Sequence, residues 1–238
     1  MSNLKNKVAY ITGGSKGIGY GIAKTLLDEG MRVAITSRDF IKAKEAAASL
    51  GADNKNVLAI ESDVRSMESE AKAIQQVMDH FGQLDVVVAN AGVGHFAPID
   101  TLLAEDWKET IDINLTGVFH TVKAAIEPLK KSEGYLVTIA SLAGTNFFET
   151  ASAYNASKFG LVGFTQAVML DLRKYGIKVT TIMPGSVATH FAGHTPSEAD
   201  AWKIQPEDIG ELVKDILQMN PRTLPSKIEV RPLHPGKG

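Results

Sequence analysis

The sequence predicts an α/β fold in which a parallel sheet of seven strands is wound on both faces by helices. Short apolar segments alternate along the chain with longer segments of helical period. The short segments are nearly continuous runs of Val, Ile and Leu, as at 84–89, which is typical of strands that are buried on both faces. Such an alternation gives parallel neighbouring strands and two covered faces.

Each expected element has its own signal. The segments with the length and composition of strands are 7–12, 32–36, 57–60, 84–89, 135–140, 178–183 and 228–230. The segments with helical spacing, each long enough to cross a sheet face and return, are 17–29, 41–50, 66–81, 104–130, 152–175 and 206–219. No linker or repeat interrupts the pattern, so one domain over 1–238 is expected. The irregular segment 184–205 is a candidate substrate lid.

Composition narrows the classes of function. The 238 residues include 25 basic and 27 acidic side chains, which leave no electrostatic footprint for nucleic acid or anionic lipid and favour a small-molecule partner. The absence of cysteine excludes thiolate nucleophiles and cysteine-ligated metals, so redox chemistry would need a borrowed cofactor. No targeting segment or apolar run of membrane-spanning length is recognised, and a cytoplasmic location is expected.

A glycine-rich turn follows the first expected strand and opens into the first expected helix. Its sequence is Thr12-Gly13-Gly14-Ser15-Lys16-Gly17-Ile18-Gly19. Glycines here allow a sharp turn, a close approach of the backbone to a pyrophosphate and tight helix–strand packing, and the helix N-terminus offers free N–H groups to an anion. The alternative interpretation is a tight turn that binds no ligand.

Two further clusters lie at strand ends or on the helix that follows one. Asn90-Ala91-Gly92 ends the fourth strand, where small residues admit a cofactor or simply make a turn. Tyr154 and Lys158 are four residues apart and share one helix face, and Ser141 lies just past the fifth strand. The alternative for this pair is a packed tyrosine beside a lysine that extends to solvent.

Together, and in this order, the clusters resemble the short-chain dehydrogenase/reductase family over essentially the whole chain. The resemblance implies a single-domain Rossmann fold whose catalytic residues here are Asn114, Ser141, Tyr154 and Lys158. Lys158 would lower the pKa of the Tyr154 phenol, which then acts as the general acid. Ser141 would orient the substrate oxygen. Asn114 would lie at a helix kink whose freed carbonyl holds a relay water, the alternative being an amide on the helix surface.

The cofactor choice depends on the end of the second strand. An NAD enzyme usually places a carboxylate there, whereas this chain has Ser37 and Arg38, with Lys16 on the same side, which favours a 2′-phosphate and therefore NADP(H). Asp63 with Val64 resembles the adenine contact of the family, unless Asp63 is a helix N-cap. The expected cofactor-binding residues are Gly13, Ser15, Lys16, Gly17, Ile18, Gly19, Ser37, Arg38, Asp63, Val64, Asn90, Ala91, Gly92, Tyr154, Lys158, Pro184, Gly185, Val187 and Thr189.

The resemblance implies an NADPH-dependent oxidoreductase that reduces a ketone or aldehyde to an alcohol. A 3-oxoacyl-[acyl-carrier-protein] reductase is the first alternative, although the ending usual for those enzymes is absent and the segment 228–235 looks more like the sepiapterin-reductase-like branch. The second is a non-catalytic NADP(H)-binding regulator. Ala89 departs from the family pattern, which has Asn there. A homodimer or homotetramer through 104–130 and 152–175 is expected. No metal site is expected, and His95, His190 and His194 are candidate substrate contacts.

Overall fold

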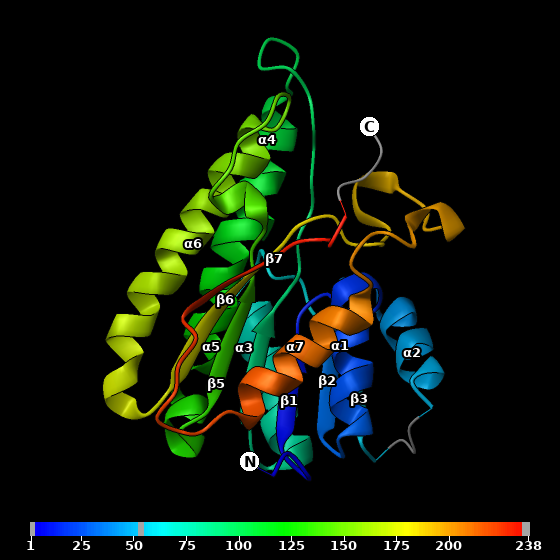
Figure 1. Ribbon diagram of the computed structural model, residues 1–238. Coiled ribbons are helices and arrows are strands. Elements are labelled where there is room, and N and C mark those ends of the chain that lie inside the picture. Colours follow the sequence, from blue (N-terminus) through cyan, green and yellow to red (C-terminus); the bar gives the residue numbers. More distant parts are fainter. Residues whose placement is uncertain (1–2, 52–54, 235–238) are drawn as a thin grey trace.

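The computed structural model describes residues 3–51 and 55–234. In this part of the chain seven strands form one sheet in the order β3-β2-β1-β4-β5-β6-β7, and every neighbouring pair is parallel (Figure 1). The strands are β1 Val8–Ile11, β2 Arg32–Ser37, β3 Val57–Glu61, β4 Val86–Ala89, β5 Tyr135–Ile139, β6 Lys178–Pro184 and β7 Lys227–Val230. The predicted doubly wound parallel sheet is confirmed.

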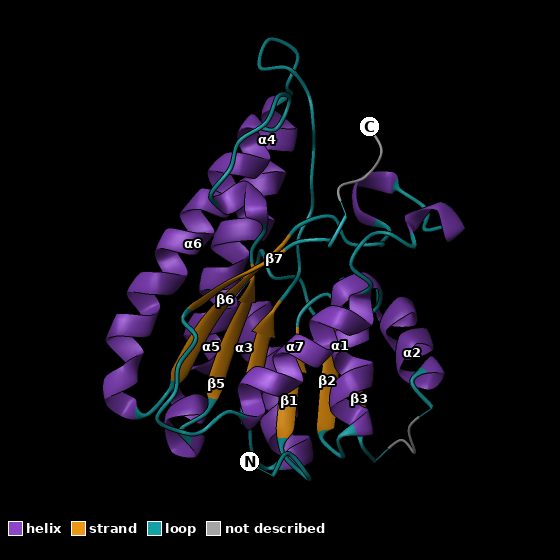
Figure 2. Cartoon of the chain, in the orientation of Figure 1, coloured by secondary structure: helices purple, strands orange, loops and turns teal. Residues whose placement is uncertain are grey.

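Helices cover both faces of the sheet. They are α1 Gly17–Asp28, α2 Phe40–Ser49, α3 Met67–Phe81, α4 Ala104–Ile111, α5 Gly117–Ser132, α6 Ser152–Leu172 and α7 Pro206–Gln218. The buried apolar residues form two large clusters, one joining the sheet to α1 and α7 and the other joining it to α3, α5 and α6. Figure 2 shows α1 and α7 in front of the orange strands. Within the described residues, no helix combines the length and apolar content that crossing a membrane requires.

The predicted elements and the observed ones differ mainly at two places. β4 begins at Val86 rather than at Leu84, because the Asp85 carboxylate accepts a hydrogen bond from the Val8 amide, 2.8 Å away, and pairs with Lys7 Nζ at 2.9 Å. The segment 104–130 is not one regular helix. A π-helical turn, Asp112–Thr116, separates α4 from α5, and there the Gly117 amide donates to the carbonyl of Asp112. The kink that the family resemblance implied near Asn114 is therefore present.

The irregular segment 184–205 is held by its own contacts. It contains two short 3-10 turns, Phe191–Gly193 and Glu198–Asp200. The Ala188 amide donates to the Ile204 carbonyl at 2.9 Å, which closes the segment at its base. The buried Asp200 carboxylate binds Lys203 Nζ and His194 Nε2, each at 2.6 Å, and these two partners hold the pKa of Asp200 well below its usual range. Pro235, the last residue of the C-terminal segment considered above, lies outside the described residues.

The Glu70 carboxylate is buried in the core and forms no ion pair with any residue that the structure describes. Glu70 of α3 is fully buried and accepts hydrogen bonds from the hydroxyls of Tyr10 (3.0 Å), Ser62 (2.6 Å) and Thr121 (2.7 Å). These donors come from β1, the end of β3 and α5, so a single side chain joins three elements on one face of the sheet. Burial of a carboxylate is tolerated when its oxygens are fully hydrogen-bonded.

Replacing Glu70 with alanine is expected to lower the free energy of unfolding by about 3 to 5 kcal/mol, because three buried hydroxyls lose their acceptor and a cavity opens. Urea denaturation followed by far-UV circular dichroism measures the change. The control is Glu68→Ala in the first turn of the same helix, since Glu68 is exposed and forms a surface ion pair with Lys72. Equal stabilities of the two variants would show that the hydroxyl cluster does not stabilise the fold.

Candidate active site

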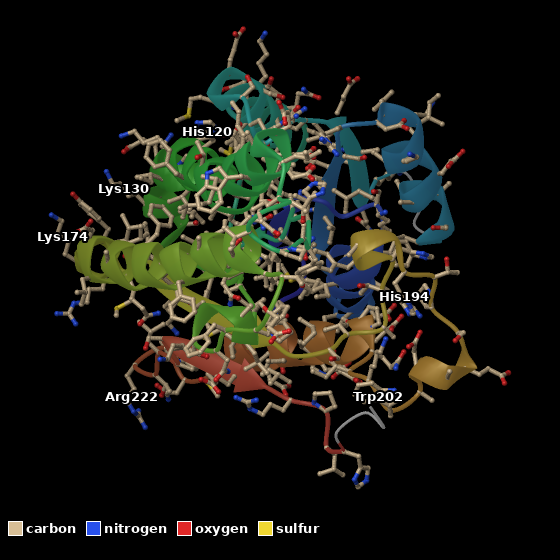
Figure 3. The ribbon with its side chains drawn as sticks, turned by 90° about the horizontal axis from the view of Figure 1, so that it is seen from above. His120, Lys130, Lys174, His194, Trp202 and Arg222 are labelled. Atoms are coloured by element: carbon tan, nitrogen blue, oxygen red, sulfur yellow. The ribbon has the colours of Figure 1, made fainter. Side chains whose placement is uncertain are left out.

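The carboxyl ends of the strands open into a cavity of about 1690 Å³. In an open parallel sheet this is the edge where ligands bind. Among the described residues that line it are all the predicted site residues except Gly19, Asp63 and Asn114. Figure 3 looks down on this edge, with His194 and Trp202 of the segment 184–205 on the side of the blue N-terminal elements and Lys174 at the far end of α6.

The glycine-rich turn forms one wall of the cavity. Gly13 and Gly17 have φ of +64° and +58°, a left-handed backbone that favours glycine. A Cβ on Gly19 would lie 2.5 Å from Asn90 Nδ2 and 2.6 Å from the Gly13 carbonyl oxygen, so this glycine permits the turn to pack on the end of β4. α1 has no side-chain N-cap, and its first amides remain available to an anion at the cavity wall.

Thr12 stabilises the glycine-rich turn, although it was not among the predicted site residues. Its buried hydroxyl oxygen accepts hydrogen bonds from the amides of Asn90 and Ala91, both at 3.0 Å. In return, Asn90 Nδ2 donates to the carbonyl oxygens of Thr12 (2.9 Å) and Gly13 (3.2 Å). The glycine turn and the 90–92 segment are therefore one hydrogen-bonded unit. Its position could have identified Thr12 as a site residue, because Thr12 is the polar residue that directly precedes the glycines.

The end of β2 carries the cations that the sequence analysis assigned to a 2′-phosphate. Arg38 lines the cavity, half-exposed, with one guanidinium nitrogen 3.4 Å from Glu109 Oε1 of α4. Lys16 is exposed and makes no ion pair with any residue in 3–51 or 55–234. The Ser37 hydroxyl accepts a hydrogen bond from the Asp39 amide at 3.2 Å. The three side chains thus lie at one end of the cavity, with Arg38 already paired.

Asp63 lies beside this end, in a smaller hollow that it shares with Arg38, Arg65 and others. Its carboxylate pairs with the Arg65 guanidinium, and this hydrogen bonding lowers the pKa of Asp63. The interpretation of Asp63 as a helix N-cap is wrong, since Ser66 caps α3 by accepting a hydrogen bond from the Ser69 amide. Val64 lines the main cavity.

Tyr154 and Lys158 lie on the buried side of α6 at the opposite end of the cavity. The side chain of Lys158 is 4% exposed, and its Nζ donates to the carbonyl of Ile139, at the end of β5, over 3.0 Å. The Lys158 Nζ is 5.7 Å from the centre of the Tyr154 ring. The alternative of a lysine that extends to solvent is therefore wrong, because the ammonium group is held inside the protein at the cavity wall.

Burial controls the pKa values of this pair. Desolvation lowers the pKa of Lys158 from 10.5 to about 8. Burial raises the pKa of the Tyr154 phenol, and a hydrogen bond with Ser141 opposes the rise. In the chain alone, burial therefore dominates the pKa of Tyr154, and the lowering of that pKa by Lys158 stays a prediction for the site with its ligands bound.

Ser141 and Asn114 complete the set. The Ser141 hydroxyl accepts a hydrogen bond from the Ala143 amide at 3.1 Å and so caps a 3-10 turn after β5. Asn114 is fully buried in the π turn, which excludes an amide on the helix surface. Its Oδ1 accepts from the Val93 amide and its Nδ2 donates to the Val93 carbonyl, both at 2.8 Å, while Nδ2 also reaches Ser157 Oγ at 3.1 Å. Asn114 therefore ties the segment after β4 to α6.

The predicted residues after β6 also face the cavity. Pro184, Gly185, Val187 and Thr189 line it. A Cβ added to Gly17 would lie 3.3 Å from the Thr189 Cγ2 methyl carbon, so this segment packs directly on the glycine turn. The two walls of the cavity meet at this contact.

Two of the three candidate histidine contacts already have carboxylate partners. His95 Nε2 lies 2.9 Å from Glu109 Oε2, and Nδ1 lies 3.4 Å from Asp106 Oδ1. His194 pairs with Asp200. All three histidines line the cavity. Across the residues described, no group of three histidine or acidic side chains is arranged to hold a metal ion.

Comparison with known proteins gives a consistent result. A family model described as short chain dehydrogenase matches residues 7–200. An uncharacterized oxidoreductase of Staphylococcus saprophyticus is 34% identical over 98% of this chain and all of its own length. An alcohol dehydrogenase from the archaeon Thermococcus sibiricus, complexed with 5-hydroxy-NADP, is 28% identical with a TM-score of 0.90, covering 96% of this chain and 97% of its own. A 3-ketoacyl-(acyl-carrier-protein) reductase from Brucella melitensis, complexed with NADH, shares the fold at 24% identity and a TM-score of 0.88, covering 97% and 98%.

Proposed function

The chain belongs to the short-chain dehydrogenase family, and from this premise we propose that it is an NADP(H)-dependent oxidoreductase that reduces a ketone or aldehyde to an alcohol. The observation that carries the proposal is the wall formed by Ser141, Tyr154 and Lys158, where a phenol, a hydroxyl and a buried ammonium group face the same cavity as the glycine turn. A protein that only bound a dinucleotide would have no need for Asn114, Ser141, Tyr154 and Lys158 together.

The residues present fit a dinucleotide. The uncapped N-terminus of α1 and the Cβ-free backbone at Gly13 and Gly17 form a cradle suited to the phosphates. Arg38 and Lys16 would hold the 2′-phosphate, and the 184–189 segment would lie along the nicotinamide. Bound NADPH would supply the hydride. The alcohol dehydrogenase neighbour, which is complexed with an NADP derivative, supports this cofactor choice.

The catalytic roles follow from chemistry at named atoms. The Tyr154 phenol would donate its proton to the carbonyl oxygen as that oxygen gains negative charge, and the Ser141 hydroxyl would hydrogen-bond the same oxygen. Lys158, kept in place by the Ile139 carbonyl, would favour the phenolate that remains. Asn114 would position the set by holding Val93 and Ser157.

The two alternatives are less well supported. A reductase that acts on acyl-carrier proteins needs a cationic surface for an acidic partner, yet Lys203 and Arg231 at the cavity pair with Asp200 and Glu229. A non-catalytic regulator has no need for the Ser141 and Asn114 side chains in addition to Tyr154 and Lys158.

The proposal is tested by following NADPH absorbance with a panel of diketones, aldehydes, a pteridine carbonyl and a β-ketoacyl thioester. We expect turnover of at least one simple carbonyl compound. Binding of NADPH without consumption of any member would favour the regulator, and reduction of the thioester alone would favour the acyl-carrier-protein reductase.

Replacing Arg38 with alanine is expected to weaken NADPH binding about 10- to 100-fold, because a charge-assisted pair with the 2′-phosphate is lost, and to leave NADH binding nearly unchanged. Isothermal titration calorimetry with both cofactors measures the two dissociation constants. Arg65→Ala is the matched control, since Arg65 lies in the neighbouring hollow and pairs with Asp63. If Arg38→Ala raised the dissociation constants of NADPH and NADH by the same factor, Arg38 would not be in contact with the 2′-phosphate.

We also propose that the chain forms a homo-oligomer through α4, α5 and α6. Several large apolar side chains are exposed on these helices, namely Trp107, Phe119, Phe159 and Leu170. Exposed apolar groups on neighbouring helices are typical of an interface between subunits. Light scattering coupled to size-exclusion chromatography would give the mass, and a monomer at micromolar concentration would contradict the proposal.

A further inference from the structure

A cluster of aromatic rings surrounds the proposed general acid. The ring of Phe96, in the segment after β4, lies 5.4 Å from the ring of Tyr154, measured between centroids, and 6.0 Å from that of Phe148. Phe191, from the segment 184–205, lies 5.5 Å from Tyr154 and 6.3 Å from Phe96. Two segments that are far apart in the sequence therefore place rings against one phenol, and Phe148 from a third segment extends the cluster through Phe96.

These rings are open to the cavity. Phe96, Phe148 and Phe191 are 40%, 51% and 36% exposed, and Phe147, which lines the same cavity, is 86% exposed. Four large aromatic side chains that remain exposed in one hollow form a concentrated apolar surface. Such a surface on a water-soluble chain is typical of a ligand-binding site.

Backbone contacts hold the segments that carry the rings. The Ala97 amide donates to the Thr150 carbonyl at 2.9 Å, which joins the Phe96 segment to the loop that carries Phe147 and Phe148. Asn155 of α6 supports that loop, since its Nδ2 donates to the Asn146 carbonyl at 2.7 Å. Rings on supported segments lose little conformational freedom when a ligand binds.

Phe191 depends on a glycine for its place. A Cβ on Gly94 would lie 2.4 Å from Phe191 Cζ, so the Phe191 ring packs directly over the Gly94 backbone. The segment 184–205 thereby places the Phe191 ring against the segment after β4, next to Phe96. The absence of a side chain at Gly94 is what permits this contact.

Three of the basic side chains that line the cavity are already paired, whereas the buried Lys158 ammonium beside Tyr154 has no carboxylate partner among the described residues. Lys203 and His194 bind Asp200, and Arg231 binds Glu229. The three paired side chains are therefore not free to bind a substrate carboxylate or phosphate, and the Lys158 ammonium is buried and already donates to the Ile139 carbonyl. The recognition chemistry that remains beside Tyr154 is that of flat apolar groups.

We infer that Phe96, Phe147, Phe148 and Phe191 form an aryl subsite, so that the substrate is a ketone or aldehyde whose carbonyl carries an aromatic group. This inference rests on the proposed function. Hydride from NADPH forms a C–H bond at the carbonyl carbon, the C=O π bond breaks, and the oxygen takes its proton from the Tyr154 hydroxyl. The products are a benzylic-type alcohol and NADP⁺.

The test compares three methyl ketones that differ in one substituent: phenyl, cyclohexyl and ethyl. Wild-type protein is expected to show kcat/KM with NADPH about tenfold higher for the phenyl than for the cyclohexyl compound, because edge-to-face contacts favour the ring beyond its apolar area. Phe96→Leu and Phe191→Leu keep an apolar side chain but remove the ring, and each is expected to reduce this preference by about 2- to 10-fold. Phe40→Leu, at an exposed phenylalanine of α2 that does not line the cavity, is expected to leave it unchanged.

A readout that does not need turnover separates the two proposals. Saturation-transfer NMR of the phenyl and cyclohexyl ketones measures binding directly, and wild type is expected to bind the phenyl compound more tightly, with the difference lost in Phe191→Leu. Selective phenyl binding without reduction of any ketone would keep the aryl subsite and overturn the proposed reaction. Reduction of all three ketones with equal kcat/KM would keep the reaction and overturn the aryl subsite.

Discussion

Tyr154→Phe is expected to lower kcat for carbonyl reduction by about 10²- to 10⁴-fold, because the variant removes the only atom proposed to protonate the substrate oxygen. The ring remains, so its contacts with Phe96 and Phe191 and the packing of α6 should persist. NADPH binding is expected to weaken by no more than about tenfold, since at most one hydrogen bond to the dinucleotide is lost. Single-turnover measurement of NADPH absorbance gives the rate of the chemical step.

The matched control is Tyr135→Phe. Tyr135 is also buried, and its hydroxyl bonds the Thr180 hydroxyl at 2.7 Å on β6, away from the cavity lining. This variant is expected to lose some stability and retain its kcat. If Tyr154→Phe kept wild-type kcat, proton donation would have to come from another group at the cavity wall, such as the Ser141 hydroxyl.

Lys158→Met is expected to abolish measurable reduction and, at pH 7, to raise the free energy of unfolding. A tenfold change in a protonation equilibrium corresponds to about 1.4 kcal/mol, so a pKa of about 8 in place of 10.5 means that the buried ammonium costs the fold about 3 kcal/mol. Methionine has a similar length and no charge, and its substitution for a buried ion is often stabilising. Thermal unfolding below pH 8 measures the gain.

The pH dependence has a definite sign. Between about pH 8 and 10.5 the unfolded chain holds more protons at this lysine than the folded one, so the Lys158 contribution to stability rises with pH across that window. The advantage of Lys158→Met over wild type should therefore be largest below pH 8 and shrink toward pH 10.5. Lys174→Met, at an exposed lysine just beyond α6, should show no such trend. A constant advantage at every pH would mean that packing, not charge, explains the stabilisation.

Much of the fold could be predicted because its signals are local. The run at 84–89 and the alternation around it predict a strand in a doubly covered sheet, and the structure contains β4 at that place. Likewise, Tyr154 and Lys158 are four residues apart on a helix, so their shared face follows from helical geometry. The glycine turn between β1 and α1 was also predictable, because its residues and both flanking elements are contiguous in the sequence.

The remaining features depend on contacts between distant residues. Arg38 and Glu109 are 71 positions apart, and only the packing of α4 beside the end of β2 brings them together. The rise in the Tyr154 pKa results from burial, opposed by a hydrogen bond with Ser141, and a spacing of four residues to Lys158 specifies neither. Ser66 rather than Asp63 caps α3 because the helix begins at Met67, and the Asp63 carboxylate pairs with Arg65 instead.

The pairing of Arg38 with Glu109 bears on how quickly the proposed enzyme could recycle. A 2′-phosphate bound at Arg38 would displace the Glu109 carboxylate, which lies 3.4 Å from the guanidinium. This exchange would offset part of the attraction between Arg38 and the phosphate, and the displaced carboxylate would keep His95 as a partner. The reverse exchange would favour release of the oxidised dinucleotide, and product release limits the rate of many enzymes. Modest affinity at this end of the cavity would thus serve throughput.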